Sequence, residues 1–255
     1  SYKRFVRDAE VVAVYSHHLS KAQHFAKELG IPAAYDDVDK LLAEVDCDVI
    51  DVCLPNYLHH GVCIKAANAG KHVIVEKPLC LSLAEADEMI AACKKSGKLL
   101  MYAEELCFAP KYERVRHIVE SGAVGSIYML RQAEKHSGPH SRWFYESDKA
   151  GGGVMMDMGC HAIAWFLWML KGATVKNVYG NFLKVMHDTD AEDHAITQIE
   201  FERDGKTVLC VGEDSWAKHG GMQDMIEVYG DKGVAYSDLF RSEEHTSELQ
   251  SRFGI

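Results

Sequence analysis

Two places in the chain carry residue types that could perform acid–base chemistry. Lys77 stands between Glu76 and Pro78, and Asp157 and His161 lie four residues apart. A lysine ammonium can stabilise negative charge that develops on an oxygen, and an imidazole beside a carboxylate can act as a general base. Together these groups could remove a proton from an alcohol. Alternatively, Lys77 is a surface lysine, and Asp157 and His161 form a pair with a structural role.

The residues before Lys77 predict a buried strand, with Lys77 at its carboxyl end. Residues 73–75 are Val-Ile-Val, a run typical of a strand that is covered on both faces of a parallel sheet. Pro78 has no N–H for the ladder and favours an extended backbone at Lys77, so we expect the strand to end there. Ligands of open α/β sheets bind at the carboxyl ends of the strands.

A glycine-rich turn precedes the second group. Gly151, Gly152 and Gly153 permit a tight turn into a helix. On one continuous helix, Asp157 and His161 would share a face with their Cβ atoms about 5–6 Å apart. We therefore expect the Asp157 carboxylate to orient the His161 imidazole and to raise its basicity.

Strands and helices alternate over residues 1–105, which predicts right-handed βαβ units and a doubly wound parallel (Rossmann) sheet. Helices are expected between the strands, and residues 1–8 are interpreted as the tail of a helix. The first strand of such a domain, with its G-x-G-x-x-G turn, is absent from the sequence. The predicted strands cover residues 10–15, 33–35, 48–54, 73–75 and 99–103.

From residue 106 to 240 strands follow strands, which predicts an α+β domain with a mostly antiparallel sheet. The tail at residues 241–255 does not continue this pattern, and we interpret it as non-native because part of it resembles a translated sequencing adapter. The predicted strands of this domain cover residues 126–134, 175–183, 194–201, 206–212 and 225–229.

Composition excludes several classes of protein. The net charge of −10 gives no general attraction to nucleic acid or to anionic membranes, and no apolar run reaches the ~20 residues of a membrane span. The eight cysteines contain no C-x-x-C pair, which favours reduced thiols in a cytoplasmic protein. We expect no metal site, because metal-ligand spacing is absent from the histidines at positions 17, 18, 187 and 194.

Three segments in this order resemble the Gfo/Idh/MocA oxidoreductases: Pro55-Asn56 with His59, Glu76-Lys77-Pro78, and residues 151–161. Asp193 and Ser215-Trp216 match further landmarks of that family. The resemblance implies catalytic roles for Lys77, Asp157 and His161. It also implies cofactor contacts from Leu54, Pro55, Asn56, His59, Glu76 and Lys77.

The activity implied by the resemblance is hydride transfer between a nicotinamide (NAD or NADP) and a carbinol of a sugar, cyclitol or related polyol. His161 would take the hydroxyl proton, Asp157 would hold His161, and Lys77 would polarise the reacting oxygen. Two alternatives are an NAD-dependent glycosidase of the same superfamily and a non-catalytic dinucleotide or sugar sensor. A homo-oligomer formed through the second-domain sheet is also expected.

Cofactor choice depends on the end of the second strand of such a domain, where an acid usually binds the ribose of NAD. Ser16, His17 and His18 occupy that place, so we expect NADP to be tolerated, with Ser16 and either His17 or Lys21 touching its phosphate. Six further residues could line the substrate side, but we expect surface or structural roles for them: Tyr102, Glu104, His136, His140, Arg142 and Trp143.

The strand order 3-2-1-4-5-6 of this fold places the absent first strand between residues 11–15 and 49–54. These two strands should therefore either close up on each other or leave the sheet open. Unpaired buried backbone groups cost ~1–3 kcal/mol each. We expect the chain as given to be poorly soluble and to bind no dinucleotide.

Overall fold

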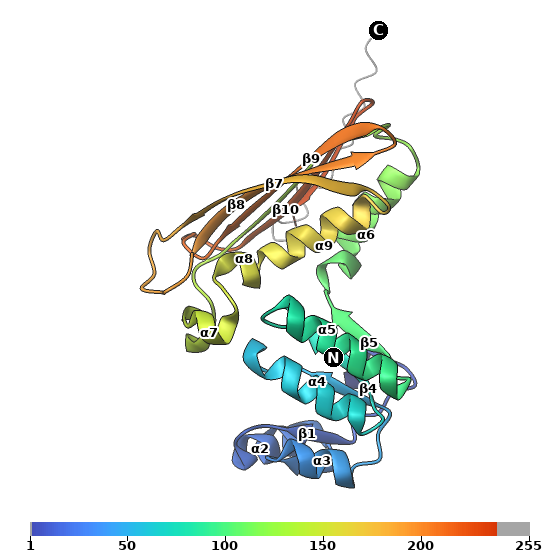
Figure 1. The fold of residues 1–255 in the computed structure, drawn as a ribbon, viewed down its shortest axis with the longest axis vertical. Helices are drawn as coiled ribbons and strands as arrows, with labels where there is room; N and C mark the ends of the chain where they lie inside the picture. Colours follow the sequence, from blue (N-terminus) through green and yellow to red (C-terminus); the bar gives the residue numbers. More distant parts are fainter. Residues whose placement is uncertain (1, 239–255) are drawn as a thin grey trace. The chain divides into compact units, whose positions relative to one another are not determined.

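Two units, each with its own secondary structure and core, make up the computed structural model, which describes residues 2–238 (Figure 1). The first unit contains residues 1–54 and 58–103. The second contains residues 55–57 and the described residues from 104 onward. The tail that the sequence marks as non-native, residues 241–255, lies outside the described residues.

The first unit alternates strands with helices, as the sequence predicts. Its strands are β1 (Ala13–Tyr15), β2 (Ala33–Tyr35), β3 (Val49–Val52), β4 (His72–Glu76) and β5 (Leu100–Ala103). Its helices are α1 (Tyr2–Phe5), α2 (Leu19–Leu29), α3 (Val38–Glu44), α4 (His59–Asn68) and α5 (Leu83–Ser96). A short 3-10 helix, η1 (Asn56–Leu58), follows β3.

All ladders among the described strands of this unit are parallel, which confirms the expected fold class. β1 pairs with β2, and β3, β4 and β5 pair in that order, but β1 and β3 share no ladder. The five strands therefore form two sheets instead of one. The strands at residues 11–15 and 49–54 were expected either to pair with each other or to leave the sheet open. They do not pair, so the sheet is open between them.

Capping residues fix the helix ends in this unit. The Asp37 Oδ1 accepts hydrogen bonds from the N–H groups of Asp39 and Lys40 at 2.8 and 3.1 Å, and α3 begins there. Gly30 and Gly97 end α2 and α5 in the left-handed region, with φ of 60° and 68°. These polar caps leave the apolar helix faces to cover the sheet.

Ser82 and Glu85 form a variant of the capping box at the start of α5. Ser82 Oγ accepts from the Glu85 N–H at 3.2 Å, but the Glu85 carboxylate accepts from the Leu81 N–H instead of the Ser82 N–H. The core beneath α4 and α5 includes Val73 and Val75, both fully buried. β4 is thereby held in the interior up to the residue before Lys77.

The second unit contains a six-stranded sheet in the order β11-β10-β6-β9-β8-β7. Among the described strands of this second-unit sheet, only the β6–β9 pair is parallel. The expectation of a mostly antiparallel sheet is therefore confirmed. The strands are β6 (Ile127–Lys135), β7 (Thr174–Leu183), β8 (His194–Arg203), β9 (Lys206–Ser215), β10 (Gln223–Gly230) and β11 (Val234–Asp238).

Three of the described helices pack against this sheet (Figure 1): α6 (Pro110–Glu120), α8 (Val154–Asp157) and α9 (Gly159–Met169). The unit also contains α7 (Ser147–Ala150) and the 3-10 helices η2 (Leu106–Phe108) and η3 (Arg142–Tyr145). Trp165 and Phe166 of α9 are fully buried in a core that also contains Leu130 and Ile226 of the sheet. Truncation of such an aromatic residue typically costs ~3–5 kcal/mol.

The single helix predicted after the glycines is interrupted. Met158 separates α8, which ends at Asp157, from α9, which begins at Gly159. Asp157 and His161 therefore do not lie on one continuous helix. A Cβ on Gly159 would lie 2.3 Å from the Met155 Sδ, so a larger residue here would have to displace the flexible end of that side chain.

A buried aspartate fixes the loop between β7 and β8. Asp193 Oδ1 accepts from the Val185 N–H at 2.6 Å, and its Oδ2 accepts from the N–H groups of Met186 and His187 at 2.8 Å each. Burial alone would raise the pKa of Asp193, but these three N–H groups together with the His187 ring lower it to about 2. The landmark residue Asp193 therefore has a structural role here.

We expect Asp193→Asn to lower the free energy of unfolding by about 2 kcal/mol at pH 7. The folded-state pKa lies below the unfolded value, so this stabilisation is present above about pH 5 and is lost as the pH falls towards 2. Urea denaturation at pH 7 and pH 3 measures the difference. Asp188→Asn, at an exposed position of the same loop, is the matched control. A deficit that is as large at pH 3 as at pH 7 would contradict this explanation.

Among the described residues, none of the helices has the length and apolar character that a membrane crossing requires.

Candidate active site

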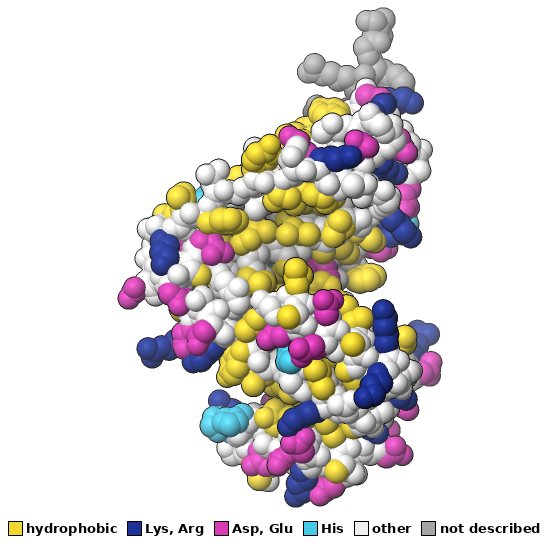
Figure 2. Space-filling model, viewed as in Figure 1, with side chains coloured by type: hydrophobic (Ala, Val, Ile, Leu, Met, Phe, Trp, Pro, Cys, Tyr) yellow, Lys and Arg dark blue, Asp and Glu magenta, His cyan; other side chains and the backbone are white. Residues whose placement is uncertain are grey.

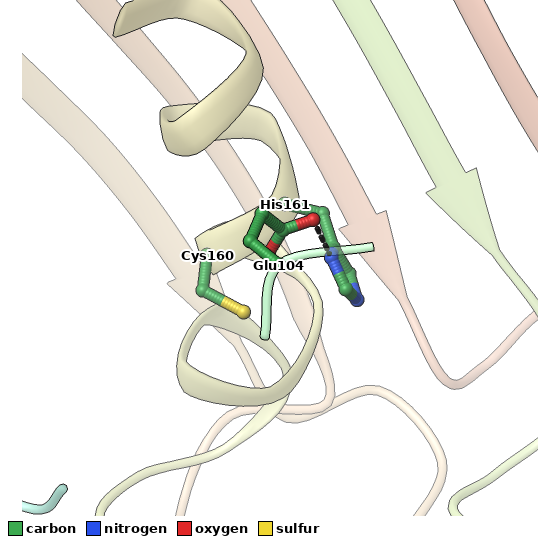
Figure 3. A group of neighbouring side chains, drawn as sticks. All are labelled: Glu104, Cys160 and His161. Carbon is green, nitrogen blue, oxygen red and sulfur yellow. Dashed lines mark hydrogen bonds and ion pairs between the residues drawn. The ribbon is translucent and has the colours of Figure 1, made fainter. Parts of the chain in front are cut away.

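The second unit contains a buried ion pair between His161 and Glu104. His161 lies in the first turn of α9, and Glu104 directly follows β5 in the chain. Its Oε1 lies 2.6 Å from the His161 Nδ1, and the two side chains are only 8% and 4% exposed (Figure 3). A carboxylate only accepts hydrogen bonds, so Nδ1 carries the proton in this pair. Nε2 is then the atom of the neutral imidazole that can accept a proton.

The carboxylate bonded to His161 Nδ1 belongs to Glu104, a partner that the sequence analysis did not predict. Asp157 Oδ2 accepts from the indole N–H of Trp216 at 3.1 Å. Trp216 is fully buried and Asp157 is 8% exposed. That Asp157 also orients His161 stays a prediction.

Aromatic rings surround Trp216 and hold it against Asp157. Phe144 and Tyr145 pack edge-on to its ring with centroids 6.4 and 6.1 Å apart. His136, half-buried, also faces Asp157: burial lowers the pKa of His136, and the negative charge of Asp157 opposes that shift. Asp157 therefore connects the turn before α9 to the strand end that carries Trp216.

Cys160 lies beside this pair. One ligand atom each from Glu104, Cys160 and His161 falls within 4.8 Å of the others, a spacing at which the three could hold a metal ion. The thiol of Cys160 donates to the Asp157 carbonyl at 3.2 Å, and Figure 3 shows the three side chains together. The expectation of no metal site stays a prediction.

In the first unit, His59 joins the ends of two neighbouring strands. Its Nδ1 lies 2.9 Å from the Pro78 carbonyl oxygen and its Nε2 lies 2.7 Å from the Leu54 carbonyl oxygen, and the side chain is fully buried. Both partners are acceptors, so both contacts are satisfied only when both ring nitrogens donate. His59 thus fixes the loops that follow β3 and β4.

Lys77 lies at the carboxyl end of β4, where the sequence predicts it. Its backbone N–H donates to the Glu76 Oε2 at 3.0 Å, and the following bond to Pro78 is cis. The Glu76 carboxylate therefore braces the turn through the backbone. Whether Lys77 and Glu76 contact a cofactor stays a prediction.

The other predicted cofactor residues divide between the two units. Asn56 lies in the second unit, where its Nδ2 donates to the Ala150 carbonyl at 2.8 Å. Ser16 and His17 follow β1, and Ser16 Oγ accepts from the His18 N–H at 3.4 Å. The side chain of His17 is exposed. No carboxylate stands at this strand end, in agreement with the sequence.

Sequence reasoning missed the roles of Glu104 and Trp216. Glu104 was expected to have a surface or structural role, but it is buried and holds the imidazole. Its position just after the last parallel strand was the available signal, because strand ends in such folds carry functional residues. Trp216 could not be paired with Asp157 from the sequence, since 59 residues separate them.

Two family models match the chain. Residues 1–104 match an oxidoreductase family with an NAD-binding Rossmann fold, and residues 112–236 match the GFO/IDH/MocA C-terminal domain.

The curated relatives include several dehydrogenases. D-glucoside 3-dehydrogenase of Escherichia coli is 34% identical over 70% of this chain and 51% of its own length. A trans-1,2-dihydrobenzene-1,2-diol dehydrogenase of Xenopus laevis is 30% identical over 79% and 60%. Myo-inositol 2-dehydrogenase of Thermotoga maritima is 26% identical over 93% and 70%. The chain thus spans roughly half to two thirds of the length of the first two relatives.

Among solved structures, GenD2 from gentamicin A biosynthesis, in complex with NAD, superimposes with a TM-score of 0.84 at 30% identity, covering 91% of this chain and 66% of GenD2. The fold therefore has a counterpart in a protein whose structure was solved with NAD.

Proposed function

Because the chain belongs to the Gfo/Idh/MocA oxidoreductase family, we propose that the full-length protein is an NAD(P)-dependent dehydrogenase that acts on a carbinol of a sugar, cyclitol or related polyol. The observation that carries this proposal is the buried ion pair of Glu104 with His161. It places the proton on Nδ1, so that Nε2 is the ring nitrogen that can act as a base.

His161 Nε2 takes the hydroxyl proton of the substrate. Glu104 stabilises the imidazolium that forms, because a carboxylate 2.6 Å from Nδ1 favours the charged ring. Asp157 holds the turn before α9 through Trp216. Lys77 donates a hydrogen bond to the reacting oxygen and stabilises its developing negative charge. A bound nicotinamide supplies the hydride acceptor.

The first unit offers a rigid frame for the nicotinamide end of a dinucleotide. Two residues hold this frame. His59 contacts the carbonyl groups of the loops after β3 and β4, and the Glu76 carboxylate accepts a hydrogen bond from the Lys77 N–H. The carboxyl ends of parallel strands are the usual ligand edge of such sheets. Leu54, Pro55, Asn56 and His59 are proposed to bind on this side.

We expect the full-length protein to accept NADP as well as NAD. Ser16 and His17 leave the strand end without a carboxylate that would repel a 2'-phosphate. Ser16→Asp should therefore weaken NADP binding at least about tenfold and leave NAD binding nearly unchanged. Calorimetric titration of both cofactors measures this. Ser20→Asp, in the first turn of α2, is the matched control. A wild-type preference for NAD of about a hundredfold or more would refute NADP tolerance.

The substrate class is supported by relatives named as dehydrogenases of a glucoside, an inositol and a dihydrodiol. A screen of the full-length protein against a panel of polyols and sugars, following reduced nicotinamide, tests the proposal. Reduction with at least one member supports a dehydrogenase. Cleavage of a glycoside without net cofactor reduction would identify the glycosidase alternative, and cofactor binding without turnover of any panel member would favour a sensor.

A homo-oligomer formed through the sheet of the second unit is also proposed. β7 is an edge strand whose residues are all exposed, and apolar side chains gather over it in Figure 2. Val178 is 64% exposed and Tyr179 is 56% exposed, which is unusual for an edge strand facing only water. Val178→Lys should lower the oligomeric state in analytical ultracentrifugation, whereas Lys176→Ala should not. The expected cytoplasmic location stays a prediction.

A further inference from the structure

A row of acidic residues crosses the sheet of the second unit on its buried face. Asp224 of β10 lies opposite Glu134 of β6, and Glu134 lies opposite Asp214 of β9. Residues opposite each other on neighbouring strands project from the same face, with Cβ atoms about 5 Å apart. The three residues are 1%, 6% and 0% exposed. Adjacent buried carboxylates cannot all carry a charge without compensation.

Asp224 has a hydrogen-bond donor and Asp214 has none. The Tyr112 hydroxyl donates to Asp224 Oδ1 at 2.5 Å, and burial raises the pKa of Asp224 to about 6 against the opposing effect of this bond. Both carboxyl oxygens of Asp214 are buried without a hydrogen-bond partner. An ionised carboxylate in that position would lose its hydration without any replacement, which a protonated acid avoids to a large extent.

Lys135 and His161, the basic side chains near Asp214, are each bonded to another carboxylate. Lys135 Nζ lies 2.5 Å from Glu213 Oε2, and the His161 Nδ1 is bonded to Glu104. Burial, followed by the negative charge of the neighbouring strand, raises the pKa of Asp214 well above its usual range. The titratable groups that face it are Glu134 and Lys135 from β6, Asp157 from α8 and His161 from α9.

Asp214 also lies against the turn that carries the proposed base. Its Oδ2 is 3.2 Å from the position that a Cβ on Gly159 would take, and 3.7 Å from that of a Cβ on Gly212. Gly159 begins α9, two residues before His161. The Asp214 side chain therefore fills the space beneath the first turn of this helix.

We propose that Asp214 is a positioning residue for His161 that works as a neutral acid, supporting the first turn of α9 without adding negative charge beside the imidazole. The inference rests on the proposed role of His161 as a base. An ionised Asp214 would favour the imidazolium and would remove His161 from that role at neutral pH. A neutral Asp214 leaves Glu104 as the carboxylate that sets the basicity of the ring.

Carboxyl carbon NMR of the full-length protein labelled in its aspartate side chains tests the protonation state without any substitution. We expect one buried carboxyl resonance to keep the position of a protonated acid throughout a titration from pH 6 to pH 8. Asp214→Asn should remove that resonance. If every aspartate resonance of the wild-type protein has the position of a carboxylate at pH 7.5, the proposal is overturned.

A histidine NMR titration tests the effect on the base. Asp214→Asn keeps the size and neutrality of the acid, so we expect the protonation midpoint of His161 to move by less than about 0.5 unit. Glu104→Gln, which removes the ionised partner, should lower that midpoint by about 1 unit or more. A shift of half a unit or more in Asp214→Asn would show that Asp214 is ionised and contradict the proposal. Neither measurement needs a substrate, so its outcome is independent of whether the dehydrogenase proposal holds.

Discussion

Replacing His161 by asparagine should lower kcat of the full-length protein by roughly 10²- to 10⁴-fold, which is the usual contribution of a general base. Asparagine can still hydrogen-bond to Glu104 but cannot take the substrate proton. Steady-state rates with the best substrate from the polyol and sugar panel measure the loss. The affinity for NAD, measured by calorimetry, should change little.

Lys77→Ala should also lower kcat strongly, because the charge that develops on the reacting oxygen loses its stabilising ammonium. If both residues act in the same step, the double variant loses less than the product of the two single effects. His117→Asn, at an exposed histidine of α6, is the control for replacing a histidine. A single variant that keeps near wild-type turnover removes its residue from the mechanism.

Replacing Glu104 by glutamine should change the pH dependence as well as the rate. The carboxylate favours the imidazolium, and the base works only as the neutral ring, so activity falls as the pH drops through the midpoint of His161. Without that carboxylate the midpoint is lower, and the acid limb of kcat/KM should move to lower pH by about 1 unit or more. The rate at the optimum should fall by about 10- to 100-fold because the ring loses its orientation.

Glu105→Gln is the matched control for this prediction, since Glu105 is the exposed neighbour of Glu104. It should leave both the rate and the acid limb unchanged. An unshifted acid limb in Glu104→Gln would mean that Glu104 does not set the basicity of His161, and the role of a structural ion pair would then be preferred.

Most of the fold was predictable because its signals are local. The apolar runs that predicted the strands reflect interactions over a few residues, as do the caps Asp37 and Ser82 and the glycines at helix ends. β11 was missed because it is only five residues long and its sequence, Val-Ala-Tyr-Ser-Asp, contains residues with weak strand preference.

The candidate site was less predictable because long-range packing decides it. α8 ends at Asp157 and α9 begins at Gly159, a break that the spacing of the residues did not predict. Glu104 reaches His161 across 57 positions in the sequence, so only the folded second unit reveals this pair.

The central claim is that the protein moves a hydride from a carbinol carbon to a nicotinamide while His161 takes the proton. The most direct test uses the best panel substrate deuterated at that carbon, with the reduced cofactor and the product analysed by mass spectrometry. We predict one deuterium in the reduced nicotinamide, a ketone product in equal amount, and loss of both in His161→Asn. Deuterium that stays in the product, or a hydrolysed glycoside without net reduced cofactor, would contradict this account.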